Sequence, residues 1–128
     1  MAKKRVFISF DYDHDLDIKN SLVGQSKLSD SPFDISDMSI TEAVEQNWKE
    51  NARKRIKSSD LVIVMCGKHT DTAKGVAAEL SITQEERKPY FLLAGHGSES
   101  KKPVNAYSDD KIYNWTWDNL KLLIDGKR

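Results

Sequence analysis

The sequence predicts an α/β fold in which a mostly parallel five-stranded sheet carries helices on both faces. Short apolar runs recur along the chain at even spacing, and segments with helical periodicity lie between them. The run "LVIVMC" is apolar at every position, which is typical of a central parallel strand covered on both sides. Strands that alternate with helices form open parallel sheets with three layers. A chain of 128 residues fits a single domain, residues 1–128.

Each expected strand is marked by its residue types. "RVFISF" is rich in β-branched and aromatic residues, and "YFLLAG" lies between Pro89 and Gly95, which bound a strand well. Two shorter runs, "FDI" and "KIYNW", are expected to form outer strands. In chain order, the expected strands are residues 5–10, 33–35, 61–66, 90–95 and 111–115.

Four helices are expected between and after these strands. The second is marked most clearly, because acidic residues follow Thr41 and the basic run "RKRIK" closes the segment, as the helix dipole favours. The third carries small and apolar residues on one face and ends in "EERKP", and Gly126 stops the last. In chain order, the helices are expected around residues 16–23, 41–57, 72–86 and 117–124.

Charge and cysteine content exclude several classes of protein. The 20 basic and 20 acidic residues balance, which argues against a nucleic-acid-binding protein with a basic face. The single cysteine, Cys66, allows no disulfide and no zinc site built from several cysteines within the chain. No apolar run reaches the roughly 20 residues of a membrane span, and the first residues lack the apolar core of a signal peptide. We therefore expect a cytoplasmic protein that contacts neither nucleic acid nor membrane.

In open parallel sheets the ligand site lies beyond the carboxyl ends of the strands. The stretch "DYDHDLD" follows the first strand there, and its alternating acids resemble a calcium loop. An EF-hand loop that begins at Asp11 would need Gly and Glu where this chain has Leu16 and Leu22. Acids that neutralise and cap the start of a helix explain the stretch better than calcium binding does.

"CGKHT" stands between the central strand and a helix, where a phosphate-binding loop would lie. The P-loop motif fails, because the first Gly would fall on Val62 and His69 follows Lys68. Gly67 still allows a tight turn, and a helix N-terminus can bind phosphate; an ordinary strand-to-helix turn is the alternative. A metal site built from the three histidines would need a convergence that the sequence does not show, so no metal is assigned.

Glu79 lies in "GVAAELS", among small and apolar neighbours. A glutamate on a helix is by default a surface residue. If this one faces the cleft beside residues 9–11 and 67–70, desolvation would tune its carboxyl for acid, base or electrostatic work.

Together, "VFISF" followed by Asp11, "SSDLVIVMCGKHT" and the helix with "VAAEL" resemble the TIR-like domains. Within that family they are most similar to the bacterial group that includes the TIR-like signalling subunit of the Thoeris anti-phage system. The resemblance covers roughly residues 4–124 and implies a flavodoxin-like, three-layer fold. It also implies cleavage of NAD⁺ at the nicotinamide–ribose bond, with NAD⁺ as substrate, no cofactor and a linear or cyclic ADP-ribose-type signal as product.

The resemblance assigns the family's essential glutamate to Glu79. Nucleotide-binding residues are expected from the resemblance and from the turn after the central strand. They are Ser9, Phe10, Asp11, Asp37, Met38, Gly67, His69 and Thr70. Self-association, or a partner that triggers the domain or reads its signal, is also implied.

Two other functions stay open. Many related enzymes carry Trp-Cys-x-x-Glu, and here Gly75 and Val76 stand at the Trp and Cys positions, which motivates a non-catalytic adaptor that only binds other proteins. A flavodoxin-like receiver or nucleotide-binding domain is the third alternative. The receiver version needs a phosphorylatable Asp at the end of the strand where this chain reads "MCGKH".

Overall fold

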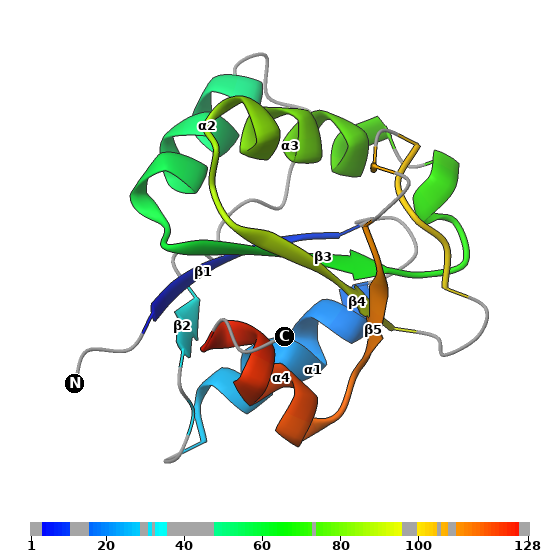
Figure 1. The fold of residues 1–128 in the computed structure, drawn as a ribbon. Coiled ribbons are helices and arrows are strands. Elements are labelled where there is room, and N and C mark those ends of the chain that lie inside the picture. Colours follow the sequence, from blue (N-terminus) through cyan, green and yellow to red (C-terminus); the bar gives the residue numbers. More distant parts are fainter. Residues whose placement is uncertain are drawn as a thin grey trace.

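The chain forms one five-stranded sheet in which every strand pairing is parallel. A computed structural model describes residues 4–10, 16–28, 31, 33–35, 48–72, 74–95, 100–104, 106–107 and 110–125. The strands are β1 (Lys4–Ser9), β2 (Phe33–Ile35), β3 (Leu61–Cys66), β4 (Tyr90–Ala94) and β5 (Ile112–Asn114). Their order across the sheet is β2-β1-β3-β4-β5 (Figure 1). This is the flavodoxin-like order, and it confirms the expected fold class.

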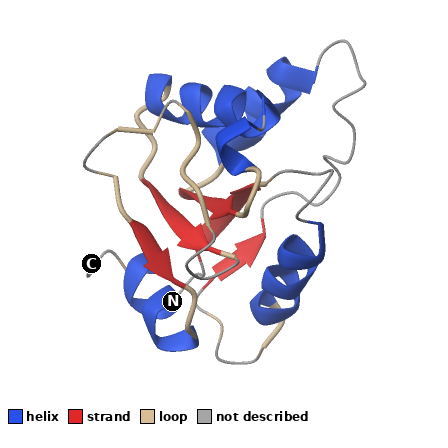
Figure 2. Cartoon of the chain, turned by 90° about the vertical axis from the view of Figure 1, so that its right-hand side faces the viewer, coloured by secondary structure: helices blue, strands red, loops and turns tan. Residues whose placement is uncertain are grey.

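Helices cover both faces of this sheet (Figure 2). They are α1 (Leu16–Ser26), α2 (Trp48–Ser58), α3 (Lys74–Glu85) and α4 (Trp117–Ile124), with a short 3₁₀ helix, η1 (Thr70–Thr72), before α3. Helices α1 and α4 pack on one face, and α2 and α3 pack on the other. Within the described ranges, each helix is too short or too polar to cross a membrane.

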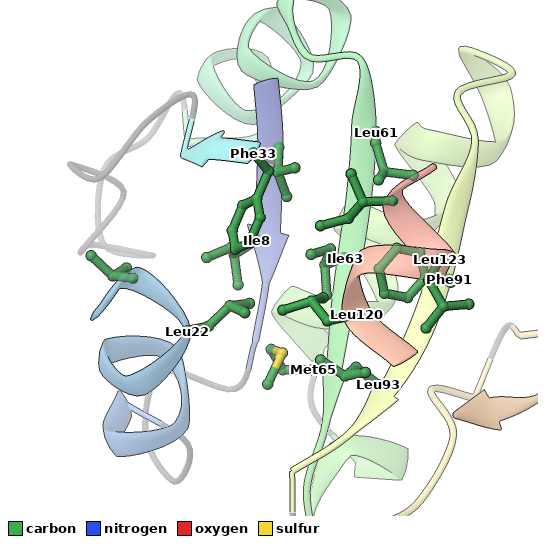
Figure 3. Packing of buried hydrophobic residues seen from close by; sticks show 13 residues of the cluster. Ile8, Leu22, Phe33, Leu61, Ile63, Met65, Phe91, Leu93, Leu120 and Leu123 are labelled. Carbon is green, nitrogen blue, oxygen red and sulfur yellow. The ribbon is translucent and has the colours of Figure 1, made fainter. Parts of the chain in front are cut away.

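Two apolar clusters hold the three layers together. On the first face, Leu22 of α1 and Leu120 of α4 meet side chains from the four strands β1 to β4, including Ile63 of β3 (Figure 3). On the second face, Ile56 of α2 and Leu80 of α3 meet other side chains of β1, β3 and β4. Full burial of one such side chain contributes about 2 kcal/mol, so the sheet is stabilised from both sides.

The expected elements agree with this structure except at helix ends. Each strand lies within a residue or two of its expected range, and α4 has the expected bounds. The helix expected over 72–86 is wrong at its start, because Thr70–Thr72 forms η1 and α3 begins at Lys74. The helix expected over 41–57 corresponds to α2, and residues 41–47 lie outside the described residues.

Candidate active site

The last residue of β1 faces the layer formed by α2 and α3. Side chains of a strand alternate between the two faces of its sheet. Val6 and Ile8 belong to the cluster under α1 and α4, whereas Phe7 belongs to the cluster under α2 and α3. Ser9 follows the direction of Phe7, is fully buried, and pairs in register with Val64 of the neighbouring strand. A hydroxyl group is therefore buried at the carboxyl end of β1.

Helix α3 brings a carboxyl group to that hydroxyl. Val76 and Leu80 are fully buried against the sheet, and Glu79 lies on the same buried side of the helix with only 7% of its surface exposed. The Ser9 hydroxyl donates a hydrogen bond of 2.7 Å to Oε1 of Glu79. The default assignment of Glu79 as a surface residue is therefore wrong. The structure instead shows the other expected arrangement, in which the Glu79 carboxyl is desolvated and lies beside residue 9.

Burial changes the acidity of this carboxyl group. The pKa of Glu79 is raised from 4.5 to about 7, because desolvation raises it by more than the hydrogen bond from Ser9 lowers it. Among the described residues, no ionised side chain adds a further shift. A pKa near 7 leaves both the charged and the neutral carboxyl populated at neutral pH. Such a group can serve as acid, base or electrostatic stabiliser.

Two further residues of α3 bear on Glu79: Thr83, which the sequence does not single out, and Gly75. The buried Thr83 hydroxyl donates a 2.8 Å hydrogen bond to the Glu79 carbonyl oxygen, one helical turn back. Gly75 is one turn before Glu79, and a Cβ atom added there would meet no atom within 4 Å apart from its chain neighbours and the nearby backbone of its own helix. Residues four apart share a helix face. The side of α3 that carries Glu79 therefore has free space at position 75.

A second polar arrangement closes the end of β3. The Gly67 N–H donates a 2.7 Å hydrogen bond to Oγ1 of the buried Thr70, which fixes the turn into η1. The Lys101 N–H donates to the Gly67 carbonyl oxygen at 3.0 Å, and the Gly95 N–H donates to the Cys66 carbonyl oxygen at 2.8 Å. The turn after β3 is therefore held by the segment that follows β4. Cys66 itself carries a buried thiol, as expected.

The predicted nucleotide-binding residues fall into three groups. Ser9 contacts Glu79, and Gly67 contacts Thr70 at the end of the adjacent strand, while His69 is exposed in the same turn. Phe10 packs against the cluster under α1 and α4, which is the sheet face opposite Glu79. The remaining three, Asp11, Asp37 and Met38, lie outside the described residues. Nucleotide binding by any of the eight stays a prediction.

One hollow lies elsewhere in the described structure. It has a volume of about 380 Å³ between α2 and α3, and Glu79 does not line it. Its lining residues are Glu50, Arg53, Ala78, Ser81, Ile82 and Glu85. Within the described ranges, no three His, Cys, Asp or Glu side chains gather closely enough to hold a metal ion. His14 and His96 lie outside those ranges. Among the described residues, the buried Ser9–Glu79 pair is therefore the best candidate for a chemical role.

Comparison with known proteins agrees with the fold. No curated protein matches the sequence significantly. A family model described as "Thoeris protein ThsB, TIR-like domain" matches residues 7–100, which is more than half of the chain and includes both Ser9 and Glu79. The chain therefore belongs to the family of TIR-like domains of the Thoeris protein ThsB, a family of anti-phage signalling proteins.

Proposed function

We propose that this domain cleaves the nicotinamide–ribose bond of NAD⁺ and converts the ADP-ribose part into a linear or cyclic signal in bacterial anti-phage defence. The observation that carries the proposal is the Glu79 carboxyl, which is buried and bonded to Ser9 at the carboxyl end of β1. Ligand sites of open parallel sheets lie at this edge. The proposal places the reaction in the cytoplasm, with NAD⁺ as substrate and no cofactor.

The chemistry needs little more than a well-placed negative charge. When the bond between ribose C1′ and the nicotinamide nitrogen breaks, the electron pair leaves with nicotinamide, and positive charge develops on the ribose. A carboxylate at Glu79 would stabilise that charge, as carboxylates do for the oxocarbenium-like transition states of glycosidases. Water, or a nucleophilic atom of the ADP-ribose itself, then attacks C1′ and releases a proton. A pocket that excludes water favours the second route and a cyclic product.

The test is to incubate the purified protein with NAD⁺ at low and high protein concentration and to identify the products by chromatography and mass spectrometry. Glu79→Gln removes the charge with little change in shape, and Glu85→Gln is the matched control, since Glu85 is an exposed acid on the same helix. We expect nicotinamide release by the wild type and by Glu85→Gln, and a loss of about 100-fold or more in Glu79→Gln. A folded Glu79→Gln variant that releases nicotinamide at the wild-type rate would overturn the proposal.

A second candidate function is a non-catalytic adaptor that binds a copy of itself or another protein. Gly75 favours it, because related enzymes carry Trp at this position and here there is only free space. The same incubation separates the two functions. A folded wild-type protein that releases no nicotinamide, even when concentrated, would favour the adaptor, and the mass of any product would separate hydrolysis from cyclisation.

A further inference from the structure

We infer that Ser9 is a positioning residue for Glu79: its hydroxyl fixes the direction of the carboxylate and favours its charged form, in place of a direct contact with nucleotide. The consequence for catalysis rests on the proposed function. The contact itself does not, because the hydrogen bond between the two side chains is observed directly.

The Ser9 hydroxyl already uses its hydrogen-bonding capacity on Glu79. A serine hydroxyl has a single hydrogen to donate, and in this structure that hydrogen is directed to Oε1 of Glu79 at 2.7 Å. The side chain is fully buried, so a nucleotide would have to displace Glu79 or the surrounding side chains to receive a hydrogen bond from it. Ser9 therefore reaches the reaction through the carboxyl group of Glu79.

In the described part of the chain, the elements packed around the Glu79 carboxyl place their basic side chains away from it. Helix α3 packs against β1, β3 and α2. The basic residues Arg53 and Lys57 of α2 pair with acids at the far end of α3, and Lys4 and Arg5 stand at the opposite end of β1 from Ser9. On β3 the titratable group is the buried thiol of Cys66. Among the described residues, the Ser9 hydroxyl is thus the group that opposes the desolvation of Glu79.

The experiment compares the protonation of Glu79 in the wild type, in Ser9→Ala and in Ser9→Thr, which keeps the hydroxyl. The protein is labelled with carboxyl-¹³C glutamate, and the signal of Glu79 is assigned by its disappearance in Glu79→Gln. The control is Ser26→Ala, which removes another buried serine hydroxyl, one that donates to the Val23 carbonyl oxygen. If Ser9→Ala fails to fold, Ser9→Cys supplies a weaker donor of similar size.

We expect Ser9→Ala to raise the titration midpoint of Glu79 by about one pH unit, the order of a lost hydrogen bond to a charged group. Ser9→Thr and Ser26→Ala should keep the wild-type midpoint. Nicotinamide release by Ser9→Ala should fall most below pH 7 and recover toward high pH, with KM for NAD⁺ unchanged. An unchanged midpoint, or a rise in KM that is equal at every pH, would overturn the inference. If the wild type releases no nicotinamide, the proposed function fails, and the titration still decides the role of Ser9.

Discussion

The Ser9 hydroxyl lies 2.7 Å from Oε1 of Glu79, although the two residues are 70 positions apart in the chain. The contact joins the end of the first strand to the third helix, and both side chains are buried. It links the acidity of one carboxyl group to the integrity of the fold.

The proposed reaction should depend on pH through Glu79. Only the charged carboxylate can stabilise positive charge on the ribose, and burial raises the pKa of Glu79 to about 7. Nicotinamide release by the wild type should therefore rise with pH and level off above about 7. The measurement is kcat/KM for NAD⁺ between pH 5 and 9. A profile that is flat across pH 7, in an active protein, would contradict this role for the carboxylate.

Stability should also depend on pH, with the opposite sign. The Glu79 carboxyl titrates near 4.5 when exposed and near 7 when folded, so the folded state binds the proton more tightly. Its contribution is fully present below pH 4.5 and is lost as pH rises through 7. Glu79→Gln has no such titration, so its free energy of unfolding relative to wild type should increase by about 3 kcal/mol between pH 4.5 and 8. Urea denaturation at several pH values measures this difference. Glu85→Gln should show no comparable increase.

Arg53 should tie α2 to the end of α3 in a salt-dependent way. Its guanidinium group bonds Glu85 and Glu86 at 2.7 Å each, and these two carboxylates raise its pKa. All three side chains are partly or largely exposed, so solvent and salt screen the attraction. Arg53→Gln should lower Tm slightly at low salt, and the loss should shrink as NaCl is added. Lys54→Gln, a change in an exposed basic residue of the same helix, is the control. A loss of Tm that is independent of salt would indicate packing in place of ion pairing.

Gly24→Ala should stabilise the protein. Gly24 is exposed in the last part of α1, and an added Cβ atom would meet no atom within 4 Å apart from its chain neighbours and the nearby backbone of its own helix. Alanine favours a helix over glycine by about 0.5–1 kcal/mol, mainly because glycine loses more backbone freedom on folding. Urea denaturation should show this gain. Gly75→Ala, with the same free space but in the first turn of α3, should gain less; a loss of stability at Gly24 would contradict the prediction.

Thr116 should fix the start of α4. Its hydroxyl accepts a 3.1 Å hydrogen bond from the Asn119 N–H, which would otherwise lack a partner within the helix. Thr116→Ala should cost about 1 kcal/mol in the free energy of unfolding. Thr116→Ser keeps the oxygen and should retain most of the wild-type stability. Equal losses in the two variants would show that the methyl group, and not the hydrogen bond, matters.

The sequence predicted the sheet well because its strands carry clear signals. "LVIVMC" is apolar throughout, and the structure buries all six residues of β3. Helix ends were harder to predict, since Thr70–Thr72 and α3 differ only in which carbonyl oxygens their N–H groups reach. Backbone hydrogen bonds of this kind leave little trace in residue type.

The candidate site was predicted in part. The sequence singles out Glu79 because its carboxyl stands among small and apolar residues, and the burial of Glu79 agrees with the hypothesis that it faces residue 9. The hydrogen bond between Glu79 and Ser9 could not be predicted in the same way. It depends on which face of the sheet the Ser9 side chain points to, and the alternation of side chains along β1 gives that face only once the strand register is known. The hydrogen bond between Lys101 and Gly67 joins two loops, and no residue pattern in either loop predicts it.

The parallel pairing of β1 with β3 also bears on how the chain folds. Val6 stands beside Leu61 and Ser9 beside Val64, so these neighbours are separated by a long stretch of chain that includes α1, β2 and α2. Bringing the ends of such a stretch together costs conformational entropy before the contacts between them can form. Proteins rich in contacts between distant residues therefore fold slowly. The carboxyl group of Glu79 can meet its hydroxyl partner only after this closure. During refolding from urea, the shifted acidity of Glu79 should therefore appear late, together with the completed sheet.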